Sequence, residues 1–338
     1  MHTYKRSDDR WECRVSVVSD GTRKYKSYYG KTQQEAELKA AFDCGHRDDN
    51  KAAGLLVKDL ALEWLLLCSE RVRDGTLSAY QNKVYKHIIP DIGTLKAAYF
   101  TREQAREYIA EKTGSGLSDT YVHSLGIALR AIFKEAGEKY GIENPFDIKI
   151  PSVRKREIKL LTSDEKKKVL KHGGIAEKIA LTMGLRIGEV SGLRGEDVQD
   201  GVLRVSRTVE RIQLSGGGTR LIIGTPKTNS SKRLIPIPDN VRELMNASEE
   251  RYIIGGGECP VEPRMIEYNW KRFCAAHGVR PVNFHALRHT FATSALEAGV
   301  DIKTVSEILG HSSVQLTMDL YCHPSMEHKM KCMTMLWG

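Results

Sequence analysis

Four separated segments in the second half of this 338-residue chain carry side chains that can act on a phosphodiester. Cutting DNA through a protein hydroxyl without a metal requires a nucleophile, cations for the charge on the phosphorane oxygens, and an acid for the departing deoxyribose oxygen. Arginines, lysines, histidines and a tyrosine in these segments can supply all three. The segments are GLRIGEVSGL at 184–193, TPKTNSSKR at 225–233, HALRHTFAT at 285–293 and LGHSSVQLTMDLYCH at 309–323.

Arg186 and Arg288 are the candidates for charge stabilisation, because a guanidinium is planar, always charged and able to bind two non-bridging oxygens at once. Arg186 follows a predicted helix end at Gly184, and Glu189, three residues later, is placed to hold its guanidinium. A lone arginine is more often a surface residue or a helix cap. Only the combination of these two with the other segments favours a site.

His285 and Arg288 lie three residues apart on a predicted helix that Asn283 can cap, so both side chains project from one face. His285 and His289, four apart, have the spacing of zinc ligands in metalloproteases, but Ala286 stands where those motifs have a glutamate. We therefore expect no metal. His289 is interpreted as a structural hydrogen-bonding residue.

The last segment combines a histidine and a tyrosine. His311 follows Gly310, which should end a helix over 302–309 and leave the imidazole at a turn. Tyr321 is one of 13 tyrosines and is distinguished by its position, ten residues after His311. Since a phenol has a pKa near ~10, cations must stabilise its anion or a base such as His285 must take its proton.

The loop at 225–233 offers two lysines. Lys227 lies between two predicted strands, and Lys232 is a rival in the same loop. The residue types alone leave both open as proton donors. We expect Lys232 and its neighbour Arg233 to contact DNA.

An ordered set of residues in these segments resembles the catalytic signature of the tyrosine recombinases, the family of phage lambda-type and conjugative-transposon integrases: Arg186, Lys227, His285, Arg288, His311 and Tyr321. The resemblance implies that Tyr321 is the nucleophile, that Lys227 protonates the leaving 5′ oxygen, and that His311 contacts the scissile phosphate. The implied reaction cuts and rejoins DNA through a 3′-phosphotyrosyl link and a Holliday junction, with no cofactor. It integrates, and in reverse excises, a mobile element.

The resemblance also implies partners. Four protomers would hold two double-stranded attachment sites, with a directionality factor (excisionase) and a DNA-bending protein as possible helpers. The apolar tail after Tyr321 would dock on a neighbouring subunit or pack on its own domain. Two alternatives stay open: a type IB topoisomerase, which shares this chemistry, and a catalytically silent DNA-binding regulator.

The elements that must position these residues predict a multidomain α+β chain. Residues 1–54 are expected to form a three-stranded sheet plus a helix, which the resemblance implies is an arm-type DNA-binding domain. Residues 55–150 are expected to be all-α, because apolar residues recur there at helical spacing, and the resemblance implies that they form the core-binding domain. Residues 151–338 are expected to form the catalytic domain, mainly helical with a small antiparallel sheet, after a Pro-containing linker that places the boundary near Lys155.

In the first domain, residues 10–30 alternate β-prone and polar side chains around Asp20-Gly21, a strong hairpin signal. Thr32 is a plausible helix N-cap, with Glu35 three residues later. We expect the exposed strand positions to carry a basic and aromatic DNA-binding face: Arg23, Lys24, Lys26 and Tyr28. A stabilising appendage without DNA contact is the other interpretation.

Charge and cysteine content limit the class of protein. The formal net charge of +9 divides into +2 for 1–54, zero for 55–150 and +7 for 151–338, which suits a polyanion partner for the last part. The seven cysteines include no CxxC pair, and no apolar run is long enough to span a bilayer. These features predict a cytoplasmic protein without a membrane partner, and the resemblance to integrases implies a bacterial, nucleoid-associated one.

Overall fold

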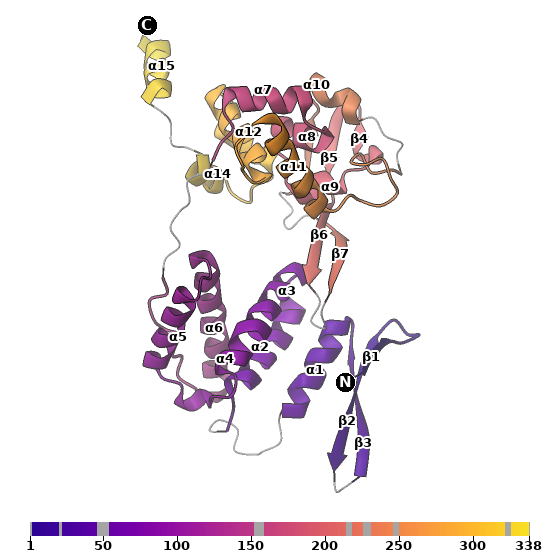
Figure 1. Cartoon of the computed structure of the whole chain (residues 1–338), viewed down its shortest axis with the longest axis vertical. Coiled ribbons are helices and arrows are strands. Elements are labelled where there is room, and N and C mark those ends of the chain that lie inside the picture. Colours follow the sequence, from indigo (N-terminus) through magenta and orange to yellow (C-terminus); the bar gives the residue numbers. More distant parts are fainter. Residues whose placement is uncertain are drawn as a thin grey trace. The chain divides into compact units, whose positions relative to one another are not determined.

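A computed structural model of the chain describes residues 2–19, 22–45, 54–151, 159–213, 218–225, 231–245, 250–321 and 326–337 (Figure 1). The chain is mixed helical with small antiparallel sheets. It divides into two compact units, one of Met1–Arg156 with Ile212–Arg220 and one of Glu157–Arg211 with Leu221–Gly338. The expected boundary residue, Lys155, lies outside the described residues.

The first unit begins with an antiparallel sheet of order β1-β2-β3, made of β1 (His2–Lys5), β2 (Trp11–Ser19) and β3 (Thr22–Gly30). The expected hairpin strands are confirmed, and their turn at 20–21 lies outside the described residues. Helix α1 (Gln33–Gly45) follows. Its start is capped as the sequence predicts. The Thr32 hydroxyl accepts a hydrogen bond from the Glu35 backbone N–H at 3.1 Å, and the Glu35 carboxylate accepts one from the Lys31 backbone N–H at 2.7 Å.

One face of this sheet packs against α1. Tyr28 lies opposite Cys13 in the β2–β3 register, and both belong to a small apolar cluster with Ala36 and Ala40 of α1. The expectation that Tyr28 lies on an exposed face is therefore wrong, because alternation along β3 turns it toward the helix. Lys26, two residues earlier, has its ammonium 5.5 Å from the Tyr28 ring centroid. The side chains of Arg23 and Lys24 lie outside the described residues.

The opposite face of the sheet is the exposed aromatic and basic one. Tyr25 and Tyr29 are 66% and 41% exposed. Arg14 lies among them, and its guanidinium donates to Glu12 at 3.0 Å. Hydrogen bonds from Ser27 and several neighbours lower the pKa of Glu12 to about 2. The sheet thus fixes one ionised carboxylate beneath a surface of rings and guanidinium groups.

A helical bundle completes the first unit. The bundle is helical, as the sequence predicts. Its helices are α2 (Val57–Arg71), α3 (Asp74–Lys83), α4 (Ile89–Ile92), α5 (Arg102–Gly114) and α6 (Asp119–Tyr140), with a π-helical turn (Val84–Ile88) and a 3-10 turn (Ala97–Tyr99). Three stacked or tilted rings form part of its core, Phe100, Phe133 and Phe146. Leu38 of α1 belongs to the same core, so α1 is shared between sheet and bundle.

The second unit holds every candidate catalytic residue. Its helices are α7 (Ser163–His172), α8 (Ile175–Met183), α9 (Ile187–Gly192), α10 (Asp239–Arg242), α11 (Pro263–His277), α12 (His285–Glu297), α13 (Ile302–Leu309), α14 (Val314–Tyr321) and α15 (Met326–Trp337), with 3-10 turns Gly195–Asp197 and Glu243–Met245. Its strands are β4 (Val198–Gln199), β5 (Val202–Val205), β8 (Arg233–Pro236) and the parts of β6 (Thr208–Gln213) and β7 (Thr219–Gly224) that lie outside Ile212–Arg220.

The strands of this unit form two small sheets. One has the order β4-β5-β8 and the other pairs β6 with β7. The extended stretch 202–213 is therefore split at Ser206-Arg207 between two sheets. This split carries β6 away from β5 and lets it pass beside α9, where a Cβ on Gly188 would lie only 2.7 Å from the Thr208 hydroxyl oxygen.

The core of the second unit joins α8, α9, α11 and α12. Trp270 is fully buried, and its indole N–H donates to the Val282 carbonyl at 2.7 Å. Two helices end as the sequence predicts, with Gly184 and Gly310 in the left-handed region at φ 68° and 64°. None of the described helices is long and apolar enough to cross a membrane.

Candidate active site

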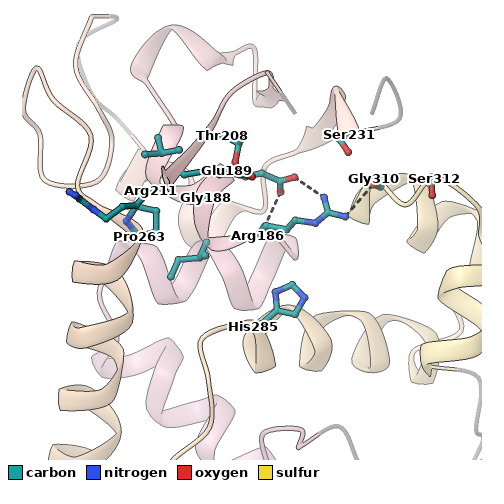
Figure 2. A pocket seen from close by; sticks show the side chains of 13 residues that line it. Arg186, Gly188, Glu189, Thr208, Arg211, Ser231, Pro263, His285, Gly310 and Ser312 are labelled. Carbon is teal, nitrogen blue, oxygen red and sulfur yellow. Dashed lines mark hydrogen bonds and ion pairs between the residues drawn. The ribbon is translucent and has the colours of Figure 1, made fainter. Parts of the chain in front are cut away.

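A pocket of about 580 Å³ in the second unit gathers residues from elements far apart in the sequence. Figure 2 shows Arg186 extending from the start of α9 toward the turn at Gly310, with His285 rising from the start of α12. The lining residues are Arg186, Ile187, Gly188, Glu189, Thr208, Val209, Glu210, Arg211, Ser231, Pro263, His285, Gly310 and Ser312. The pocket therefore brings together residues from all four of the segments that the sequence singles out.

Arg186 is fixed by the geometry of the helix that it precedes. It is the N-cap residue of α9, and its backbone N–H donates to the Glu189 carboxylate at 2.9 Å. Its guanidinium donates to the other Glu189 oxygen at 2.8 Å and to the Gly310 carbonyl at 3.4 Å (Figure 2). Glu189 holds Arg186, as the spacing predicts, while the Arg186 side chain stays 36% exposed toward the pocket.

Glu189 is a buried carboxylate with more than one cationic partner. Burial alone would raise its pKa, but the charges of Arg233 and Arg186 outweigh that cost and lower the pKa of Glu189 to about 2. Arg233 binds both carboxylate oxygens, at 2.9 and 3.1 Å, and Arg288 approaches to 4.0 Å. The Glu189 carboxylate is thus ionised at neutral pH and is surrounded by three guanidinium groups.

Arg288 is more deeply buried than the sequence suggests. Its side chain is 1% exposed, and its guanidinium donates to the Gly184 carbonyl at 2.8 Å and to the Leu309 carbonyl at 2.7 Å. These carbonyls lie at the ends of α8 and α13, where the helices leave acceptors unsatisfied. Arg288 therefore links the ends of α8 and α13 to α12 by hydrogen bonds. It lies behind Arg186 and His285, which line the pocket.

His285 begins α12 and faces the pocket. The Asn283 side chain accepts the Ala286 amide at 3.0 Å, so Asn283 caps this helix as expected. Desolvation in the pocket and the charges of His289, Arg288 and Arg186 lower the pKa of His285 to about 4. The His289 ring meets it edge to face at 4.6 Å between centroids. His285 is therefore neutral at physiological pH.

His311 lies at the turn that Gly310 makes after α13. It is 8% exposed, and its Nδ1 lies 2.7 Å from the Thr317 hydroxyl oxygen. Desolvation and three neighbouring guanidinium groups, those of Arg288, Arg186 and Arg233, lower the pKa of His311 to about 4. Thr317 is a partner that sequence reasoning missed, although its spacing places it on the inner side of the following helix.

Tyr321 is the last residue of α14, which starts three residues after His311. Its side chain lies outside the described residues, as does the whole of Lys227. Lys232 is exposed beside the pocket residue Ser231. The structure therefore joins Arg186, Glu189, Arg288, His285 and His311 in one cluster, with the helix of Tyr321 attached to it.

Arg233 is placed differently from the expectation. Its side chain is 6% exposed and bonded to Glu189 and to the Ile308 carbonyl, so it does not lie on the open surface that a contact with DNA would require. The reason is tertiary: β8 begins beside the end of α13, and the guanidinium turns inward to the buried carboxylate. Ser231 and Ser312, which line the pocket, were also missed, and nothing in their residue type marks them.

The family comparison covers this region. Residues 152–328 match the model of the phage integrase family. A tyrosine recombinase XerC-like protein of Caldanaerobacter subterraneus is 27% identical over 94% of this chain and 93% of its own length. The ICEBs1 integrase of Bacillus subtilis is 26% identical over 74% of this chain and 75% of its own length.

Solved structures share the fold. The Tn1549 transposon integrase in complex with a circular intermediate DNA superposes with a TM-score of 0.69 at 23% identity, covering 84% of this chain and all of that one. A lambda integrase tetramer bound to a Holliday junction gives a TM-score of 0.60 at 19% identity, covering 92% of this chain and 95% of that one.

The fold, the clustered arginines and histidines, and these matches define the class of the tyrosine-type site-specific DNA recombinases. The chain belongs to the phage integrase family, whose model covers more than half of it.

The lowered pKa of His311 predicts a pH dependence of stability. An imidazole with a folded pKa of about 4 and an unfolded pKa near ~6.5 binds protons more readily in the unfolded chain. Its contribution is complete above about pH 6.5 and is lost as pH falls toward about 4, at up to about 1.4 kcal/mol per pH unit. Urea unfolding at pH 7, 6 and 5 should show the stability difference between wild type and His311→Gln shrinking. A difference that stays constant across this range would contradict the prediction.

Proposed function

We propose that Tyr321 attacks the scissile phosphate of a double-stranded attachment site. The Tyr321 oxygen forms a bond to phosphorus while the bond from phosphorus to the 5′ oxygen breaks, which leaves a 3′-phosphotyrosyl link. The departing oxygen takes a proton and becomes a 5′ hydroxyl. The single observation that carries this proposal is that Arg186 and His285 line one pocket, with Arg288 and His311 directly behind it and the α14 helix of Tyr321 starting three residues after His311.

Arg186 and Arg288 are assigned to the charge that builds on the phosphate in the transition state. Guanidinium groups held in place before the reaction stabilise such charge without reorganisation. Arg186 lines the pocket, whereas Arg288 is 1% exposed and is assigned to act on the phosphate through its charge from behind the pocket. His311, held by Thr317, is assigned to a hydrogen bond with the same phosphate.

His285 is assigned to the phenolic proton of Tyr321. A neutral imidazole can accept this proton, but a pKa of about 4 makes it a weak base in the absence of DNA. Two of the causes of that low value are the charges of Arg288 and Arg186. A bound phosphate counters these charges and raises the pKa of His285. The base therefore gains strength when the substrate is in place.

Rejoining reverses the first step. A 5′ hydroxyl from the partner duplex attacks the phosphotyrosyl link and releases Tyr321, so no cofactor or ATP is consumed. We propose four protomers on two duplexes, exchanging strands through a Holliday junction, with an excisionase and a DNA-bending protein as accessory partners. The overall result is integration and excision of a mobile element.

We propose that the exposed face of the β1-β2-β3 sheet binds a further DNA site. Arg14, Tyr25 and Tyr29 share that face, and the Arg6 and Arg10 guanidinium groups lie 5.4 and 5.6 Å from the Tyr29 ring centroid. Cations fixed over aromatic rings suit phosphate contacts next to a groove. This assignment replaces the helix-covered face that holds Tyr28.

We propose that α15 docks on a neighbouring protomer rather than on its own domain. Its apolar side chains Met330, Met333, Met335 and Trp337 are 57% to 83% exposed. An unpartnered apolar surface of this kind favours association. Sedimentation of the DNA-bound protein with and without α15 measures this docking.

Tyr321→Phe tests the nucleophile. The variant lacks the attacking oxygen, so it should form no covalent adduct with a nicked duplex that spans the crossover sequence in the DNA flanking the gene. Wild type should trap the adduct, resolved by denaturing gel, and both proteins should bind the duplex equally. An adduct with Tyr321→Phe would remove Tyr321 from this role. Relaxation of plasmids that lack any attachment site would favour a topoisomerase instead.

A sulfur leaving group decides between Lys227 and Lys232. A thiol has a pKa near ~8.5 and leaves without an acid, unlike an alkoxide. If Lys227 is the general acid, Lys227→Ala should slow cleavage of the ordinary duplex by about 10²- to 10⁴-fold. The same variant should cleave a duplex with sulfur in place of the 5′ bridging oxygen at nearly the wild-type rate. If the sulfur-containing duplex restored the cleavage rate of Lys232→Ala and not that of Lys227→Ala, Lys232 would be the residue that protonates the leaving oxygen.

The two faces of the sheet make different predictions for DNA binding. Arg14→Gln should weaken binding to duplexes taken from beyond the crossover site and reduce the salt slope by about 1. Lys26→Gln, on the helix-covered side, should have the smaller effect. Fluorescence anisotropy at several salt concentrations measures both. A larger effect of Lys26→Gln would restore the face first expected from the sequence.

A further inference from the structure

We propose that Arg233 is a positioning residue for strand cleavage, which holds Glu189 and the end of α13 in place for Arg186 and His311 and makes no contact with DNA. The inference rests on the proposed function, in which Arg186 stabilises charge on the scissile phosphate. It assigns a role to a buried guanidinium that the chemistry of cleavage does not itself require.

The first line of support is the way in which Glu189 is shared. Each of its carboxylate oxygens accepts one bond from Arg186 and one from Arg233. The side chain of Arg233 is 6% exposed and that of Glu189 is 3% exposed, so the ion pair between them is almost completely shielded from solvent. Arg186, at 36%, is the member that reaches the pocket. Arg233 therefore fixes the inner side of a carboxylate whose outer side fixes Arg186.

The second line of support is the end of α13. Three consecutive carbonyls there each accept from a different arginine: that of Ile308 from Arg233, that of Leu309 from Arg288, and that of Gly310 from Arg186. A helix end leaves such carbonyls without partners inside the helix, and cations are favoured beside them. The next residue along the chain is His311, so the same arginines locate the histidine.

The fork of Arg233 is what this geometry requires. Its two terminal nitrogens bind the two oxygens of Glu189, and its Nε donates to the Ile308 carbonyl. A lysine carries the same charge but has one nitrogen, which cannot reproduce a planar, two-pronged grip and a third bond from its side. Loss of the fork should leave Glu189 free to rotate and Arg186 free to move with it.

The experiment compares Arg233→Gln and Arg233→Lys with wild type in single-turnover cleavage of the nicked crossover duplex, with DNA affinity measured in parallel. Misplacement of a catalytic group by about 1 Å costs on the order of 100-fold in rate. We expect a loss of about that size for Arg233→Gln, with affinity and its salt slope unchanged. Arg233→Lys should not restore the rate, because charge without the fork is insufficient.

The matched control is Arg204→Gln, which removes one positive charge from an exposed position of the neighbouring strand β5 and should leave the rate unchanged. The thermal unfolding of each variant is measured to check that it folds. If Arg233→Gln does not fold, the test uses Arg233→Lys, which keeps a cation beside Glu189. A cycle in the Arg186→Lys background adds a test of mechanism. If Arg233 acts through Arg186, adding Arg233→Gln to the Arg186→Lys protein should lower the cleavage rate by less than about threefold.

Several results would overturn the proposal. A folded Arg233→Gln protein with weaker DNA binding and a salt slope lower by about 1 would show that Arg233 contacts a phosphate. Full recovery of the rate by Arg233→Lys would reduce its role to charge. An equal loss in the Arg186→Lys background would make the two residues independent. Failure of wild type to form any adduct would instead refute the proposed function, so the two failures are distinguishable.

Discussion

The burial of one carboxylate, Glu189, is the constraint on which the catalytic unit depends. A buried charge without partners costs several kcal/mol, and removing one partner from such a group is strongly destabilising. Three arginines from three elements satisfy it: Arg186 before α9, Arg233 at the start of β8 and Arg288 on α12. These elements must therefore come together for the charge to be tolerated. The cluster keeps an excess of two positive charges, which suits a phosphate in the pocket.

The carboxyl-terminal ends of two helices also hold the arginines in place, because their carbonyl groups accept hydrogen bonds from them. α8 and α13 both stop at a glycine with positive φ, and the carbonyls at these ends accept from the same arginines that surround Glu189. Gly184 has a second reason to be glycine, because a Cβ there would lie 2.5 Å from the Phe291 ring and 2.9 Å from Leu309. The two helix ends can therefore approach α12 closely. Backbone geometry and side-chain charge thus specify the same arrangement.

The cationic surroundings also set the state of the histidines. Desolvation, followed by the charges of the nearby Arg288 and Arg186, lowers the pKa values of His285 and His311 to about 4. Both rings are therefore neutral at neutral pH, and a neutral imidazole can accept a proton or a hydrogen bond. In the proposed mechanism, the arginines assigned to the transition state therefore also keep His285, the proposed base, unprotonated. This links the electrostatics of the two tasks within one small region.

The sequence by itself determined the chemical identities, their order and the local elements. Caps at Thr32 and Asn283, helix ends at Gly184 and Gly310, and the hold of Glu189 on Arg186 are local interactions within a few residues, and all are present. Only the tertiary structure decided which side of an element is covered. It turned Arg233 inward to a carboxylate 44 residues away and placed Tyr28 against α1. Residue type shows that a side chain is basic or aromatic, whereas its burial depends on which distant element packs against it.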